Sequence, residues 1–264
     1  MGNAKVIDPV ARVAVIIPIF GRHHLTRAVL TDLARDEGIY DVWLIDNGGD
    51  FEREEASVTI VRPATNLGWA RSCNYGVQAA WGKSYVGFVL MNNDVRLSQS
   101  FVKGLIAAQL ATGGDVIGPM YDHNWPHQRG TYVGGAFSYR ARTTERTVPF
   151  VDGTCMYVQR HVFERVGVLD EQHWPKYEWG CDKDFALRVR VAGGLVWVTE
   201  RSYLNHFGRQ TAATLEGYSE FEAERENDLG MTTKWGPSWL DLLYEGFSDV
   251  PRRGLVQDRL ASLE

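Results

Sequence analysis

The first half of the chain alternates short apolar runs with segments of helical periodicity. Residues 12–20 read RVAVIIPIF, a β-branched run typical of a strand covered on both faces. Residues 24–38 then carry apolar side chains three and four positions apart and end at a glycine. This alternation continues to residue 119 and predicts an α/β fold with a mostly parallel, Rossmann-like central sheet flanked by helices. The remaining expected strands are 41–46, 57–62, 84–91 and 115–119, and the remaining expected helices are 69–82 and one from Phe101.

Three of the expected strands end in polar or glycine-rich segments. These segments are PIFGR at 18–22, DNGG at 46–49 and NND at 92–94. Ligands of such sheets bind beyond the carboxyl ends of the strands. The sequence therefore predicts a binding site where these three segments meet, although Asn and Asp are also common in simple turns.

The second half has a different pattern. Residues 131–139 and 148–160 resemble antiparallel or mixed strands around glycine turns, and residues from about 214 have a helical pattern. We expect one domain at 1–213 and a C-terminal helical extension at 214–264 that packs on this domain or mediates dimerisation. Helices are expected at 161–166 and 182–194, a strand at 195–199, and one apolar face from Trp235, Trp239, Leu242 and Leu243.

Composition excludes several classes of protein. The 264 residues carry a net charge of −5 and no broad basic stripe, so nucleic acid is not an expected partner. The three cysteines form no C-x-x-C pair, which argues against a zinc ribbon or a disulfide framework and favours a reducing compartment. The longest apolar runs are too short to span a bilayer. We expect a cytoplasmic protein without a transmembrane segment, and contact with a membrane surface stays open.

Ordered motifs across residues 12–210 resemble the family 2 glycosyltransferases of the GT-A fold, which are inverting and metal-dependent. Each fragment alone is common, whereas their order and spacing are specific. The motifs are VIIPIFGR, WLIDNGG, NLGWARSCNYGVQAAWG, LMNNDVRL, VDGTCMYVQRHVFERVGVLDE, CDKDFALRVRVAGG and LNHFG.

Two motifs depart from the family pattern. The family's D-x-D is written Asn92-Asn93-Asp94, so only its last acid is present, and the family's E-D pair is Cys181-Asp182. One carboxylate therefore remains at each chemical position.

The resemblance implies a divalent metal, Mn²⁺ or Mg²⁺, bound by Asp94 and by His206, the histidine that closes the domain. Asn92 and Asn93 carry no charge but can hydrogen-bond ribose or phosphate. The alternatives are a plain turn at NND and a structural histidine.

The resemblance also assigns Asp182 as the general base that takes the proton of the acceptor hydroxyl. The alternative is an N-terminal helix cap. Glu178 is the reserve base, and Asp184 is expected to make structural hydrogen bonds.

The remaining site residues are expected to bind the two substrates. Asp46 matches the family position that binds the nucleotide base, and its alternative is a DNGG turn. A guanidinium such as Arg71 suits phosphate but is equally common as a solvated helix residue. The donor side further includes Pro18, Phe20, Arg22, Asn66 and Gly68, and the acceptor side includes Gly153, Trp174, Tyr177 and Trp179.

The predicted function is inverting transfer of one sugar from a UDP- or dTDP-sugar to a hydroxyl of a glycan, lipid-linked glycan or protein, as in polysaccharide biosynthesis. The sequence is compatible with both a monomer and a homodimer. The alternatives are a catalytically decayed nucleotide- or carbohydrate-binding module, favoured by the missing acids, and a nucleotidyltransferase, for which PIFGRHHL is a poor triphosphate loop.

Overall fold

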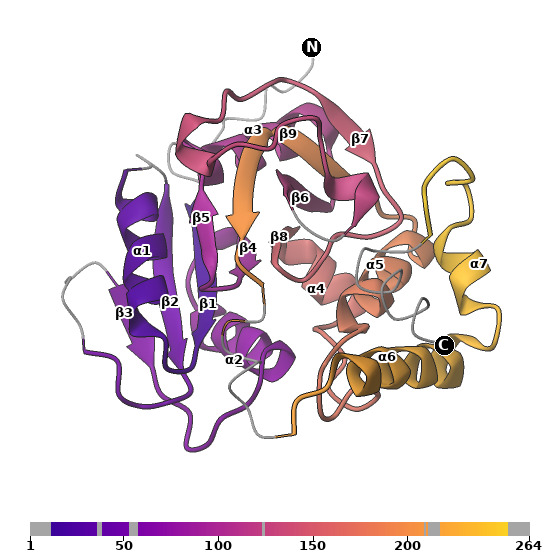
Figure 1. Cartoon of the computed structure of the whole chain (residues 1–264), viewed down its shortest axis with the longest axis horizontal. Helices are drawn as coiled ribbons and strands as arrows, with labels where there is room; N and C mark the ends of the chain where they lie inside the picture. Colours follow the sequence, from indigo (N-terminus) through magenta and orange to yellow (C-terminus); the bar gives the residue numbers. More distant parts are fainter. Residues whose placement is uncertain are drawn as a thin grey trace, which may run out of the picture.

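One large sheet runs through the molecule (Figure 1). The computed structural model of the chain describes residues 12–35, 39–52, 58–122, 125–208, 210 and 217–252. Within these residues the strand order is β3-β2-β1-β4-β8-β6-β9-β5, and β7 pairs with β9 outside this path. The strands are β1 (Arg12–Ile19), β2 (Tyr40–Asp46), β3 (Val58–Val61), β4 (Tyr85–Met91), β5 (Val95–Leu97), β6 (Val116–Tyr121), β7 (Glu145–Thr147), β8 (Cys155–Gln159) and β9 (Val196–His206).

The N-terminal half of the sheet is parallel, as the sequence predicts. β1 pairs in parallel with β2 and β4, and β2 pairs in parallel with β3. Residues 13–17 of β1 are fully buried, which explains why this strand is a continuous apolar run. The carboxyl ends of β1, β2 and β4 consequently lie at one edge of the sheet.

The C-terminal half makes the sheet mixed. β8 runs antiparallel to both β4 and β6, and β9 runs parallel to β6 but antiparallel to β5 and β7. Because β8 is antiparallel to β4, the residues just before β8 lie at the same edge as the carboxyl end of β4. The helices of the domain are α1 (His23–Ala34), α2 (Ala70–Ala80), α3 (Phe101–Thr112), α4 (Arg160–Val166) and α5 (Cys181–Val191).

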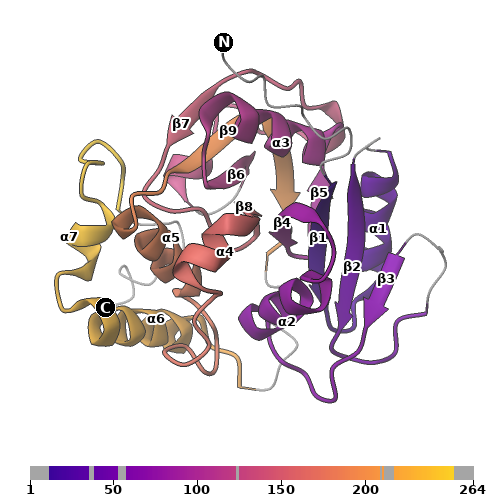
Figure 2. The ribbon, with the colours of Figure 1, turned by 180° about the vertical axis from the view of Figure 1, so that it is seen from behind.

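The C-terminal residues form α6 (Glu220–Trp235) and α7 (Trp239–Leu243), which lie beside α5 and far from β3 in both views (Figures 1 and 2). Buried Asp184 of α5 accepts a hydrogen bond from Trp235 Nε1 at 2.9 Å and forms an ion pair with Lys234 Nζ at 2.8 Å. Asp184 therefore has the structural role predicted for it, and it fastens α6 to the domain.

Several details differ from the sequence-based expectations, including the short strands β5 and β7, which were not expected. Residues 131–139 form no strand but a loop with a short 3₁₀ turn, since Asn205 bonds the backbone of Gly134 and Ala136. β9 continues to His206 instead of ending at residue 199. The expected apolar face is divided between α6 and α7, because the chain turns at Gly236. Among the described residues, none of the helices has the length and apolar character needed to cross a membrane.

Candidate functional site

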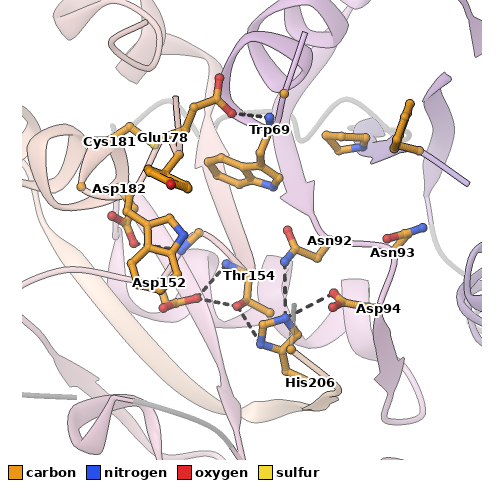
Figure 3. A pocket seen from close by; sticks show the side chains of 18 of the residues that line it. Trp69, Asn92, Asn93, Asp94, Asp152, Thr154, Glu178, Cys181, Asp182 and His206 are labelled. Carbon is orange, nitrogen blue, oxygen red and sulfur yellow. Dashed lines mark hydrogen bonds and ion pairs between the residues drawn. The ribbon is translucent and has the colours of Figure 1, made fainter. Parts of the chain in front are cut away.

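A cavity of about 350 Å³ opens at the sheet edge where the polar strand exits meet. It is bounded by the ends of β1, β4 and β9, by the residues before β8 and by the start of α5. Figure 3 shows Asp94 and His206 on one side of the cavity, Asp182 and Cys181 on the other, and Asp152 and Thr154 between them.

Asp94 and His206 meet because β5 pairs with β9. The register places Val95 opposite His206, so Asp94 Oδ1 lies 3.2 Å from His206 Nε2. Burial raises the pKa of Asp94, but the hydrogen bond and attraction to His206 outweigh it and hold this pKa below its usual value. Burial lowers the pKa of His206, but the same contacts with Asp94 bring it above its usual value.

The other nitrogen of His206 is held by a hydroxyl. His206 Nδ1 lies 3.2 Å from Thr154 Oγ1, and this hydroxyl donates its single proton to Asp152 Oδ1. Thr154 Oγ1 therefore accepts a hydrogen bond from His206 Nδ1–H. In the imidazolium form Nε2–H donates to the Asp94 carboxylate, and loss of that proton leaves the lone pair of the neutral ring on Nε2.

The two asparagines before Asp94 point in different directions (Figure 3). Asn92 Nδ2 lies 3.4 Å from His206 Nε2, and its buried Oδ1 has no hydrogen-bond partner among the described residues. Asn93 instead donates to Thr26 Oγ1 of α1 at 3.0 Å. Asn92 therefore lines the cavity with an amide oxygen that has no protein partner among the described residues, whereas the side chain of Asn93 anchors the loop to α1.

Asp182 lies in the first turn of α5 with 12% of its side-chain surface exposed. Its Oδ2 accepts the N–H of Gly153 at 3.1 Å, and its Oδ1 accepts the N–H of Lys183 at 2.8 Å. Burial and then repulsion by Asp152 raise the pKa of Asp182, against the attraction of Lys183. A carboxylate with a raised pKa that faces a cavity suits a proton acceptor.

Glu178, the reserve base, is engaged elsewhere. Its Oε2 accepts the backbone N–H groups of Trp69 and Ala70, which caps the start of α2. Gly68 at φ +80° permits this approach, because a Cβ there would lie 2.7 Å from the carboxylate. Burial raises the pKa of Glu178, and the two backbone bonds oppose it.

The expected donor residues divide into two groups. Asp46 is fully buried and accepts from Gly49 N, Phe51 N and Arg62 Nε, so its carboxylate holds the DNGG turn and does not line the cavity. Arg22 is exposed and Arg71 bonds Leu67 O, and neither lines the cavity. The residues of this set that do line it are Pro18, Phe20, Asn66 and Gly68.

The expected acceptor residues are also divided. Gly153, Tyr177 and Trp179 line the cavity. Trp174 is fully buried against Gly230 of α6, so its indole has no free face for a sugar ring, and the structure does not support that assignment.

The sequence interpretation missed several polar residues that line the cavity, among them Asn47, Asp152, Thr154 and Lys183. Asp152 and Thr154 precede an antiparallel strand, and such a start lies at the same edge as the carboxyl ends of parallel neighbours. An antiparallel assignment of β8 to β4 would have identified them.

Comparisons with known proteins agree with this architecture. The model of the family described as "Glycosyl transferase family 2" matches residues 14–167. The chain is 36% identical over 206 residues to "Uncharacterized protein Rv1525" of Mycobacterium tuberculosis (strain ATCC 25618 / H37Rv) and to "Uncharacterized protein Mb1552" of Mycobacterium bovis, with 78% of each chain covered.

Two solved structures share the fold. A crystal structure of GalNAc-T7 with UDP, GalNAc and Mn²⁺ superposes with a TM-score of 0.62 at 16% identity, over 93% of this chain. This chain spans 52% of the GalNAc-T7 chain. S. aureus TarS 1-349 superposes with a TM-score of 0.57 at 12% identity, over 90% of this chain and 72% of that one. The fold is therefore that of the GT-A glycosyltransferases.

Proposed function

Because this chain belongs to glycosyl transferase family 2, we propose that it moves one sugar, with inversion, from a nucleotide-diphosphate donor to an acceptor hydroxyl. The observation that carries the proposal is a single cavity with the Asp94–His206 pair on one side and the Asp182 carboxylate on the other (Figure 3). An inverting transfer needs a stabilised leaving group on one face of the sugar and a base on the opposite face.

A divalent ion, Mn²⁺ or Mg²⁺, suits the Asp94–His206 pair. Neighbouring ligands of an octahedral ion at about 2.1 Å are about 3 Å apart, and Asp94 Oδ1 and His206 Nε2 are separated by 3.2 Å. No group of three or more His, Cys, Asp or Glu side chains suited to a metal occurs in the described part of the chain. Two protein ligands leave positions for diphosphate oxygens and water. The ion would supply a Lewis acid for the diphosphate leaving group.

The protein groups have separate tasks in this mechanism. Asp182 accepts the proton of the attacking hydroxyl, and its two backbone hydrogen bonds fix the carboxylate. The Asn92 amide, with a buried oxygen that lacks a protein partner, hydrogen-bonds the donor. Thr154 and Asp152 keep His206 in the tautomer whose Nε2 is available.

We propose a UDP- or dTDP-sugar as donor and a glycan, lipid-linked glycan or protein as acceptor. The support for the donor is the family membership and the cavity wall of Pro18, Phe20 and Asn66 beyond the end of β1. GalNAc-T7, which shares the fold, is described with UDP and Mn²⁺. Tyr177 and Trp179 beside Asp182 offer aromatic faces for an acceptor sugar. This activity fits a cytoplasmic enzyme of polysaccharide biosynthesis.

Calorimetric titration of UDP, dTDP and GDP with Mn²⁺, and again with EDTA, tests the proposal. We expect UDP or dTDP to bind in Mn²⁺ and the binding to be lost in EDTA. Absence of binding by all three nucleotides in both conditions would contradict the proposal. Sugars activated on the nucleotide that binds then serve as donor candidates.

A further inference from the structure

A buried lysine lies beside the candidate base. Lys183 is only 5% exposed, and its Nζ lies 4.0 Å from Asp182 Oδ1. The same Nζ donates to Asn227 Oδ1 at 3.2 Å and lies 5.1 Å and 5.6 Å from the ring centres of Trp125 and Phe150. Asn227 belongs to α6, so the C-terminal extension reaches the cluster around the base.

This approach of α6 depends on a glycine. Gly180, the residue before α5, has φ +104°, and a Cβ there would lie 2.7 Å from Asn227 Oδ1 and 2.6 Å from Trp174 Nε1. Asn227 is itself only 2% exposed, and its backbone oxygen accepts from Trp174 Nε1 at 3.5 Å. Asn227, the partner of the Lys183 ammonium, is therefore held in place by its packing against Gly180 and by its hydrogen bond from Trp174.

The backbone N–H groups of Gly153 and Lys183 favour the ionised form of Asp182, whereas the other side chains around it oppose its ionisation or carry no charge. Asp152, in the segment before β8, raises the pKa of Asp182 by repulsion. Burial raises the pKa of the Cys181 thiol on α5 and of the Tyr121 phenol on β6 well above their ordinary values, so both stay neutral. Glu178 and Glu224 add carboxylates to the same cavity wall.

A largely buried carboxylate among other acids favours the protonated form, which cannot accept a proton. A fixed cation 4.0 Å from the carboxylate opposes its protonation, since two unit charges at that distance attract appreciably even at a protein-like dielectric constant. Lys183 supplies that cation, and the two aromatic rings and Asn227 restrict where its ammonium can go.

We propose that Lys183 is a positioning residue that keeps the Asp182 carboxylate ionised near neutral pH, and that Asn227 of α6 holds the Lys183 ammonium in place. This inference rests on the proposed role of Asp182 as the general base. It assigns a task in the reaction to the C-terminal extension, which the family match at residues 14–167 does not reach.

Carbon-13 NMR of the aspartate carboxyl carbons tests the inference without a substrate. Protein labelled at these carbons is titrated with acid and base, and Asp182→Asn identifies the Asp182 signal by its absence. We expect Lys183→Met to raise the midpoint of this signal by at least about one pH unit. Asn227→Ala keeps the charge of Lys183 but removes the side chain that holds its ammonium. This variant should give a smaller rise in the Asp182 midpoint.

Lys176→Met is the matched control, because Lys176 also lines the cavity, but its Nζ lies 4.6 Å from the Tyr177 ring centre and makes no ion pair with Asp182 within the described structure. It should leave the Asp182 midpoint unchanged. An unchanged midpoint in folded Lys183→Met protein overturns the inference. If Lys183→Met does not fold, Lys183→Gln and Asn227→Ala provide the same readout.

The two proposals fail in different ways. Turnover that survives in Asp182→Asn would remove Asp182 as the base, whatever the NMR titration gives. Loss of turnover in Asp182→Asn together with an unmoved midpoint in Lys183→Met would overturn only the role of Lys183. Once a donor is identified, kcat of Lys183→Met should recover at higher pH, which a purely structural defect would not do.

Discussion

The Asp94 carboxylate and the His206 imidazole, which lie far apart in the sequence, face each other at 3.2 Å because β5 pairs with β9. We expect Asp94→Ala to weaken Mn²⁺-dependent nucleotide binding by at least about 100-fold, since loss even of an indirect partner of a metal ligand costs about 10–100-fold. Calorimetry with Mn²⁺ measures this. Asp50→Ala, which removes an exposed carboxylate paired with His23, is the control. Equal Mn²⁺ affinity in Asp94→Ala and wild-type protein would exclude Asp94 from the site.

Thr154→Val should lower the affinity for Mn²⁺ by about 10–100-fold, because the hydroxyl that orients His206 is lost while the side-chain volume is nearly kept. Electron paramagnetic resonance of free Mn²⁺ gives the affinity without any turnover. Thr154→Ser keeps the hydroxyl and should bind nearly as tightly as wild type. If the valine and serine variants bind Mn²⁺ equally well, the hydroxyl does not orient the ligand.

Asp182→Asn should reduce transfer by about 10²–10⁴-fold, because the group that accepts the proton is removed. The nucleotide Kd should stay within a few-fold, since Asp182 lies across the cavity from the Asp94–His206 pair (Figure 3). Turnover and calorimetry on the same preparation separate the two effects. A parallel loss of nucleotide affinity would show that Asp182 serves binding instead.

The same substitution should stabilise the protein at neutral pH. The pKa of Asp182 is raised by burial in the folded state, so the folded state binds its proton more tightly than the unfolded state. Its contribution to stability is full below the unfolded pKa and is lost as pH rises through the folded pKa. We expect Asp182→Asn to unfold at a higher temperature at neutral pH, by about 2–4 °C for each 1 kcal/mol regained, with less difference in acid. Thermal unfolding at neutral and at acid pH checks this prediction. A larger rise in unfolding temperature in acid than at neutral pH would contradict the predicted direction of the effect.

Glu226 of α6 should protect the loop that carries Tyr177 and Trp179. Its carboxylate accepts the N–H of Lys176 at 2.8 Å and that of Tyr177 at 2.7 Å. Trypsin should therefore cut after Lys176 faster in Glu226→Ala, because the backbone at that bond is released. Glu222→Ala, which removes an exposed carboxylate on the same helix, should cut at the wild-type rate. Equal rates in the two variants would mean that α6 does not restrain the loop.

The parts of the fold predicted best are those where burial alone sets the pattern. β1, β2 and β4 are apolar along most of their length, and each was located within a residue or two. β5 was missed because three residues are too few for periodicity. The error at residues 131–139 has another cause, since Asn205 takes the backbone groups that a neighbouring strand would have used.

The site was predictable where motif order carried the information. Asp94, Asp182 and His206 come from three separate motifs, and the structure brings all three to one cavity. Asp46 shows the limit of this approach, because the motif could not reveal that Arg62 and two backbone N–H groups occupy its carboxylate. Trp174 shows another, since its burial depends on Gly230 in a helix outside the motifs.

The pairing of β5 with β9 also has a consequence for synthesis on the ribosome. β1, β2, β3 and β4 pair with one another through parallel ladders, and all of their residues precede Asp94. The pair Asp94–His206, in contrast, cannot form until the strand that ends at His206 has emerged and joined the sheet. A nascent chain that stops short of His206 can therefore hold a large part of its sheet and still lack half of the candidate metal site.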